Sequence, residues 1–228
     1  MPLPLTIIRF PDIRLEKRDA HKLRGYFGNL FKAHSPLLHN HFEDGSLRYR
    51  YPLVQYKVID EIPMLVGIND GAKLLTELFL KIKELNIDGN IYPLHQKNLD
   101  HLQGEAGLSQ TLHTYKFANR WMALNQENYK KYLTLSSADQ RQQLLNGILV
   151  SNLLSFFKGV DIWLQGQIMA TGKFTEHKTS FKNRPMLIFD GDFVANVLLP
   201  DLVGVGKQTS RGFGTVRPVR IDPKPIKS

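Results

Sequence analysis

The sequence predicts an α+β protein made of two tandem ferredoxin-like halves, of which the second is degenerate. Hydrophobic periodicity changes along the first half in the order strand, helix, strand, strand, helix, strand, which is the order of the βαββαβ unit. A second series of elements begins after a polar, glycine-containing stretch at residues 104–109. We therefore expect an N-terminal domain over residues 1–105 and a C-terminal domain over residues 110–222. The duplication rests on element order, since the residues themselves do not repeat.

In the first half, β-branched residues predict a strand at 5–10, and apolar residues at helical spacing predict a helix at 18–32. A polar loop follows. Alternating polar and apolar residues then predict a long strand at 48–59, in which Pro52 favours an edge position or a bulge. The later elements are a strand at 63–67, an amphipathic helix at 71–85 and a final strand from either 90–94 or 99–102.

The second half opens with a predicted strand at 112–118 and continues into a long helix at 137–157, for which Ser136 or Ser137 can act as the N-cap. Strands are expected at 162–174 and 185–189, joined by a basic arm, and a last strand at 213–219. No clear second helix precedes that last strand; residues 194–202 could hold a remnant of it. For this reason the second half is predicted to be the irregular one.

Composition favours a polyanionic partner and excludes several chemistries. Lys and Arg number 30 against 21 Asp and Glu, a formal net charge of +9, and such an excess attracts nucleic acid through counterion release. The chain has no cysteine, which excludes disulfides, thiolate nucleophiles and thiolate metal sites. Its first residues lack the basic segment of a signal peptide, and no apolar run is long enough to span a bilayer. We expect a cytoplasmic protein without a membrane partner.

The most specific segment is GVGKQTSRGFG at residues 204–214, which we call the glycine-rich loop. It holds Gly204, Gly206, Gly212 and Gly214 together with Lys207 and Arg211. Glycines permit a close approach of the backbone, and amides and cations can face phosphate. A P-loop would need glycine where Asp201 stands and a hydroxyl residue where Gln208 stands, and a dinucleotide fingerprint has no room so near the end. A hairpin without a ligand is the remaining alternative.

This loop, just before a final strand, resembles the C-terminal G-loop of the RAMP superfamily of CRISPR-associated proteins. Within that superfamily, the size and layout are most similar to the Cas-six repeat-processing endoribonucleases, and the His-x-His segment at residues 39–41 is similar to one variant of them. The resemblance implies tandem ferredoxin-like folds and a G-loop that lies against RNA. It also implies cleavage of a precursor transcript beside each CRISPR repeat.

His34, His39 and His41 lie in one predicted loop after the first helix, with Lys32 before them and Tyr49 after. Two histidines near their ordinary pKa of about 6.5 can serve as base and acid when a 2′-hydroxyl attacks the adjacent phosphate. Lys32 could stabilise the developing charge. The resemblance implies that His39 and His41 are the catalytic pair, with Lys32 and Tyr49 as helpers; which histidine is the base stays open.

Two other interpretations of these histidines remain. Imidazoles beside Glu43 and Asp44 could hold a metal ion, with His95, His101 or His113 joining by folding, although the spacing does not suit a helical zinc motif. They could also be incidental residues of a solvated loop. We expect no metal and no cofactor.

The basic arm, residues 172–184, carries Lys173, Lys178, Lys182 and Arg184 with phenylalanines between them. Cations can contact phosphates and aromatic rings can stack on bases, while the alternative is a solvated hairpin whose rings fold inward. In the resembling family this hairpin binds the base of the stem that the repeat RNA forms. Such binding recognises the A-form shape of the RNA duplex.

With this resemblance, the sequence predicts a metal-independent endoribonuclease, and the resemblance implies that its partner is CRISPR repeat RNA. It would leave a 2′,3′-cyclic phosphate and a 5′-hydroxyl. A CRISPR effector complex and a second copy of the chain are further expected partners. The alternatives are a non-catalytic RAMP subunit that holds guide RNA, and a metal-dependent hydrolase that uses the histidines.

Overall fold

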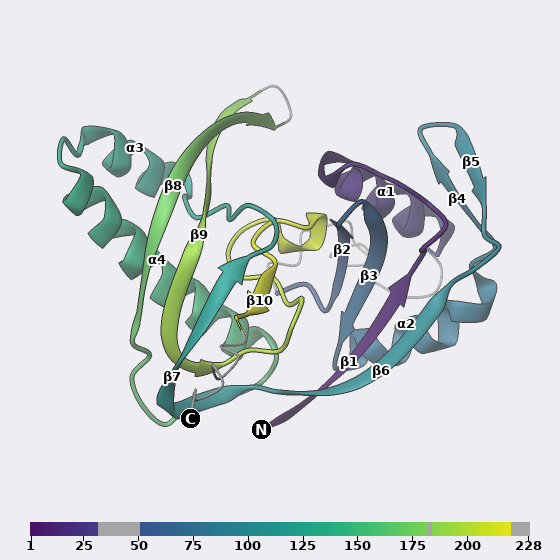
Figure 1. The fold of residues 1–228 in the computed structure, drawn as a ribbon, viewed down its shortest axis with the longest axis horizontal. Helices are drawn as coiled ribbons and strands as arrows, with labels where there is room; N and C mark the ends of the chain where they lie inside the picture. Colours follow the sequence, from purple (N-terminus) through teal and green to yellow (C-terminus); the bar gives the residue numbers. More distant parts are fainter. Residues whose placement is uncertain (32–50, 182–183, 220–228) are drawn as a thin grey trace, which may run out of the picture.

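The computed structural model describes residues 1–31, 51–181 and 184–219 (Figure 1). The elements of the first half are β1 Pro2–Arg9, η1 Lys17–Asp19, α1 Ala20–Leu30, β2 Val54–Ile59, β3 Ile62–Ile68, α2 Asp70–Leu78, η3 Phe79–Lys81, β4 Glu84–Ile87, β5 Asn90–Pro93 and β6 Asn98–Glu105. Those of the second half are β7 Gly107–Phe117, α3 Gln126–Thr134, α4 Ala138–Gly159, β8 Ala170–Phe181, β9 Arg184–Leu198, η4 Thr209–Arg211 and β10 Val216–Pro218.

The first half has the antiparallel strand order β2-β3-β1-β6, which is the ferredoxin-like order. Its two helices, α1 and α2, cover one face of this sheet (Figure 1). The strand β2 lies at the edge, as Pro52 just before it suggested. The fold class predicted from the sequence is confirmed.

The second half repeats the order as β10-β7-β9-β8. Here α3 and α4 occupy the place of the first helix, but the chain between β9 and β10 forms the glycine-rich loop with the single turn η4 instead of a second helix. The helical remnant expected at 194–202 is wrong, because β9 continues to Leu198 and buried loop residues follow. The second half is therefore degenerate at the point where the glycine-rich loop stands.

Two hydrophobic clusters hold the fold. One lies between the first sheet and helices α1 and α2, and contains Phe27, Tyr56 and Leu75. The other joins the halves, because it contains Leu5 and Val66 of the first sheet together with Leu149 of α4, Val203 just before the glycine-rich loop and Val205 within it. The loop is thus anchored in the core that both halves share.

Several predicted elements have different limits. The helix expected to reach residue 85 ends at Leu78, and residues 84–93 form the separate hairpin β4–β5, so β6 is the strand that completes the sheet. The strand expected from 162 begins at Ala170, and the one expected to end at 189 runs to Leu198. Helix α3 was not predicted; its mean hydropathy is low and Tyr132 is its one buried residue.

Candidate nucleic-acid interface

The glycine-rich loop lies between the two sheets, beside β2 (Figure 1). Backbone hydrogen bonds fix its course: Val205 N donates to Gly214 O at 2.8 Å, Gly214 N donates to Arg120 O at 2.9 Å, and Lys207 N donates to Met122 O at 3.0 Å. A loop with this many main-chain partners has one conformation to present to a ligand. Of its residues, Lys207 and Gln208 are exposed, whereas Gly204, Gly212 and Gly214 are buried.

The glycines of the loop are needed by its packing. Gly214 has φ +62°, and a Cβ placed there would lie 1.9 Å from Val205 O. Gly206 has φ +100°, and a Cβ there would lie 2.5 Å from the indole nitrogen of Trp121. Both positions combine a left-handed backbone with close neighbours, so only glycine fits without rearrangement. This steric need accounts for these glycines whether or not a ligand binds.

The loop carries two cations at different depths. Lys207 is exposed, whereas Arg211 is half-buried and donates a hydrogen bond to the Gln208 side chain. Burial lowers the pKa of Arg211, and Arg24 of α1 lowers it further. Positive charge from both halves therefore gathers at the loop, and a bound anion would relieve the repulsion between the two guanidinium groups.

Polar side chains of the first half make hydrogen bonds to the loop segment. Tyr51 donates its hydroxyl hydrogen to Gly204 O at 2.7 Å, and Gln55 Nε2 donates to the Tyr51 hydroxyl at 2.7 Å. Two residues further along β2, Lys57 Nζ donates to Thr215 Oγ1 at 2.9 Å. Sequence reasoning missed these supports. The alternation of polar and apolar residues in β2 located the polar face, but nothing in it distinguished a face covered by a loop from one open to solvent.

The basic arm contains most of β8 and the first residue of β9, and the long hairpin β8–β9 extends beyond the body of the second half (Figure 1). Lys173 and Lys178 are exposed on it. Phe174 folds inward and packs on Trp121 with ring centroids 5.0 Å apart, so at this residue the inward alternative holds. Lys182 and the side chain of Arg184 lie outside the described part of the chain.

Helix α4 fixes the base of this hairpin. Gln142 donates to Phe174 O at 2.7 Å and accepts from Phe174 N at 3.2 Å, and Asn146 accepts from Gly172 N at 2.9 Å. These side chains satisfy backbone groups of the edge strand β8. The hairpin and the loop are thus held on one framework, since Asn152 of the same helix accepts from the Trp121 indole beneath Gly206 at 3.2 Å.

Comparison with known proteins identifies the family. The model of the Cas6b N-terminal domain matches residues 1–105, and that of the Cas6b C-terminal domain matches residues 107–219. A crystal structure of Cas6b is 32% identical, with a TM-score of 0.91, over 96% of this chain and all of that one. The chain belongs to the Cas6b family.

Two further relatives are similar to the chain. The crystal structure described as the CRISPR RNA processing endoribonuclease Cas6b is 30% identical, with a TM-score of 0.78, over 96% of this chain and all of that one. The uncharacterized protein MJ0978 of Methanocaldococcus jannaschii is 33% identical over 141 residues, which are 61% of this chain and 95% of that protein.

The Cas6b match leaves the predicted catalytic residues unassigned. Lys32, His34, His39, His41 and Tyr49 lie outside the described residues. The neighbours on either side are described: Phe31 is buried at the end of α1, and Tyr51 donates its hydroxyl hydrogen to the glycine-rich loop. Within the described ranges, no group of three or more His, Cys, Asp or Glu side chains could hold a metal ion, and no helix could cross a membrane.

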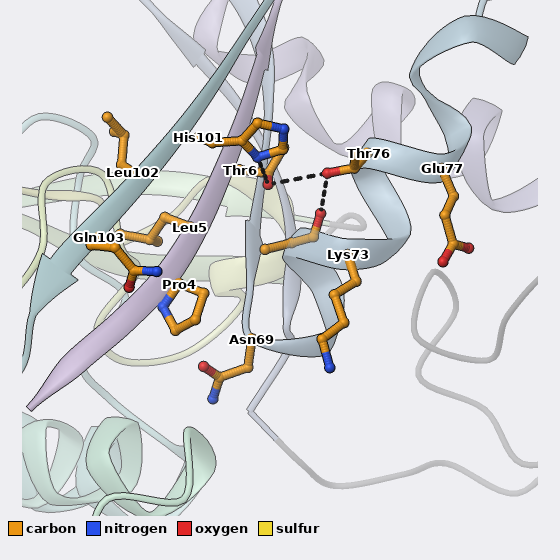
Figure 2. A pocket seen from close by; sticks show the side chains of 11 residues that line it. Pro4, Leu5, Thr6, Asn69, Lys73, Thr76, Glu77, His101, Leu102 and Gln103 are labelled. Carbon is orange, nitrogen blue, oxygen red and sulfur yellow. Dashed lines mark hydrogen bonds between the residues drawn. The ribbon is translucent and has the colours of Figure 1, made fainter.

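A pocket of about 380 Å³ lies elsewhere, between α2 and strands β1 and β6 (Figure 2). Its polar groups bond to one another: Thr6 Oγ1 lies 3.0 Å from His101 Nδ1, and Thr76 Oγ1 donates to Ala72 O at 2.9 Å. None of the predicted catalytic or RNA-binding residues lines it, although His101, which the metal-site alternative named, does. We therefore place the candidate interface at the glycine-rich loop and the β8–β9 hairpin.

The steric account of the loop predicts the effect of Gly214→Ala. The alanine would have to adopt the left-handed conformation with its Cβ against Val205 O. This should lower the free energy of unfolding by about 1–3 kcal/mol. Gly147→Ala is the matched control, because a Cβ at this position of α4 meets nothing within 4 Å. It should raise stability by about 0.5–1 kcal/mol. Urea unfolding measures both, and equal stabilities would contradict the account.

Proposed function

We propose that this chain is an endoribonuclease that binds CRISPR repeat RNA and cleaves the precursor transcript. The observation that carries the proposal is the similarity, over 96% of the chain, to the protein described as the CRISPR RNA processing endoribonuclease Cas6b. The net charge of +9 fits a polyanionic substrate. The cations that gather at the glycine-rich loop support the same conclusion.

The RNA-binding surface in this proposal consists of the glycine-rich loop and the β8–β9 hairpin. Lys207 and Arg211 contact phosphates beside the backbone of Gly204, Gly206, Gly212 and Gly214. Along the hairpin, a second stretch of the RNA's sugar–phosphate backbone is contacted by Lys173, Lys178, Lys182 and Arg184. Cations on rigid elements recognise the shape of an RNA more than its sequence. The hydrogen bonds from α4 to β8 support this, because they hold the hairpin in place before any RNA binds.

The proposed chemistry is attack by the 2′-hydroxyl on the adjacent phosphate, without a metal ion. His39 and His41 act as base and acid, Lys32 stabilises the charge that develops on the phosphate, and Tyr49 assists. Tyr51, two residues beyond Tyr49 in the sequence, donates its hydroxyl hydrogen to Gly204 O, so the described chain resumes in contact with the loop. The His-x-His pair is a part of the proposal that the Cas6b match does not assign.

We further propose that residues 1–105 and 110–222 act as two domains, with the histidines on the first and most of the RNA-binding cations on the second. A CRISPR effector complex would receive the processed RNA, and a second copy of the chain is a further possible partner. The division of labour makes the interface between the halves essential to cleavage.

Cleavage should persist in excess EDTA and yield a 2′,3′-cyclic phosphate and a 5′-hydroxyl, because the proposed base, acid and cation are all side chains. The assay is a transcript containing the repeat, with the ends analysed by phosphatase and kinase treatment. Loss of cutting in EDTA with rescue by a divalent ion would falsify the proposed chemistry. Tight binding without cutting would identify a non-catalytic RAMP subunit instead.

His39→Ala and His41→Ala should each slow single-turnover cleavage by about 10²- to 10⁴-fold while RNA affinity stays nearly constant. The base must be neutral and the acid protonated, so the rate of the unmodified protein should fall on both sides of about pH 6.5, and each variant should lose one limb. His95→Ala is the control, since His95 is exposed between β5 and β6. Unchanged rates in both loop variants would place catalysis elsewhere.

A further inference from the structure

A lysine is completely buried beneath the glycine-rich loop. Lys57 of β2 has 0% of its surface exposed, and its Nζ donates to Thr215 Oγ1 at 2.9 Å. The Thr215 hydroxyl, itself buried, donates to Gly212 O at 3.0 Å. Because the one hydroxyl hydrogen of Thr215 points to Gly212, its oxygen accepts from Lys57. A continuous chain of hydrogen bonds thus runs from the first half into the loop.

This chain ends at the residue that closes the turn η4. Gly212 has φ +86° and follows Arg211, and its N–H donates to Thr209 O at 3.1 Å. A Cβ at Gly212 would lie 3.1 Å from Tyr56 O, so the turn rests directly on β2. The position of Gly212 therefore fixes the direction in which Arg211 leaves the loop. Lys57 and Thr215 determine that position.

Burial makes the charge of Lys57 costly. Desolvation lowers the pKa of Lys57 to about 7, and the carboxylate of Asp201 offsets part of this. Asp201 in turn lies 3.6 Å from Arg217 Nε. The Lys57 ammonium can donate three hydrogen bonds. Among the described residues, Thr215 accepts the one that it makes. A buried charge with so few partners is poor at stabilising a fold, and an apolar residue of the same size would often do as well.

We infer that Lys57 is a positioning residue for RNA binding, which holds Gly212 and Arg211 through Thr215 and adds a positive charge beneath the loop. The inference rests on the proposed function of the loop. Phosphates above the loop favour the charged form of Lys57, so RNA binding takes up a proton. In the free protein this charge is lost as the pH rises through about 7, so RNA affinity is highest below that pH and falls as the pH rises.

The test compares Lys57→Met with the unmodified protein. Methionine is an unbranched side chain one atom shorter than lysine, and it carries no charge. The probe is a hairpin RNA with 2′-O-methyl groups, which keep the phosphates and block 2′-hydroxyl attack. At pH 7, Lys57→Met should bind it about 10- to 100-fold more weakly, which is the effect of one hydrogen bond to a charged group. Its affinity should stay constant up to about pH 9, whereas the affinity of the unmodified protein falls over that range.

The melting temperature distinguishes a role of Lys57 in positioning the loop from a role in stabilising the fold. Lys57→Met should melt at or above the temperature of the unmodified protein, because no charge has to be desolvated. If Lys57→Met binds RNA with the same affinity and the same pH dependence as the unmodified protein, the inference is overturned. A lower melting temperature and weaker binding, with the pH dependence retained, would overturn it as well.

Two further variants complete the experiment. Thr215→Val keeps the lysine and removes the hydroxyl that links it to Gly212, so it should also weaken binding; unchanged affinity would overturn the inference even if Lys57→Met failed to fold. Lys207→Ala tests the proposed function by itself. If it binds the hairpin as the unmodified protein does, the loop is not the RNA surface. If it binds more weakly while Lys57→Met and Thr215→Val bind normally, the inference about Lys57 alone fails.

Discussion

The hydrogen bonds from β2 and Tyr51 to the glycine-rich loop are the interaction on which the rest of the architecture depends. Tyr51 holds Gly204 O and Lys57 holds Thr215, so the first half grips the loop near both of its ends. The loop in turn occupies the place where a regular second half would carry a helix. Without that helix, one face of the shared core would be uncovered. Val203 and Val205, at the start of the loop segment, pack into this core and cover it. Two ferredoxin-like halves thereby present one surface.

The same arrangement explains why the loop needs glycines. Its backbone is pressed between Trp121, Val205 and β2, where there is no room for a Cβ at Gly206 or Gly214. The backbone that carries Lys207 and Arg211 is therefore fixed in the absence of a ligand. A preformed surface avoids the entropy cost of ordering a mobile loop on binding. The hairpin, held at its base by Gln142 and Asn146, is prepared in the same way.

The sequence predicted the order of the elements because hydrophobic periodicity is local, and the long helix α4 with its buried stripe is the clearest example. It could not separate the hairpin β4–β5 from the end of α2, since Leu85 and Ile87 continue an apolar pattern that suits either structure. It also missed α3, whose residues are mostly polar. The glycine-rich loop was found from composition alone, but its support by Tyr51 and Lys57 depends on contacts between residues 153 and 158 positions apart, which no local pattern contains.

The central claim is that the glycine-rich loop carries the phosphate contacts of this Cas6b family member. The most direct measurement is the salt dependence of RNA affinity in Lys207→Ala/Arg211→Ala, compared with Lys81→Ala/Lys83→Ala, which removes two exposed charges from the first half. The loop variant should lose about one to two units from the slope of log affinity against log salt, while the control keeps the slope of the unmodified protein. Equal slopes in a loop variant that melts normally would contradict the account.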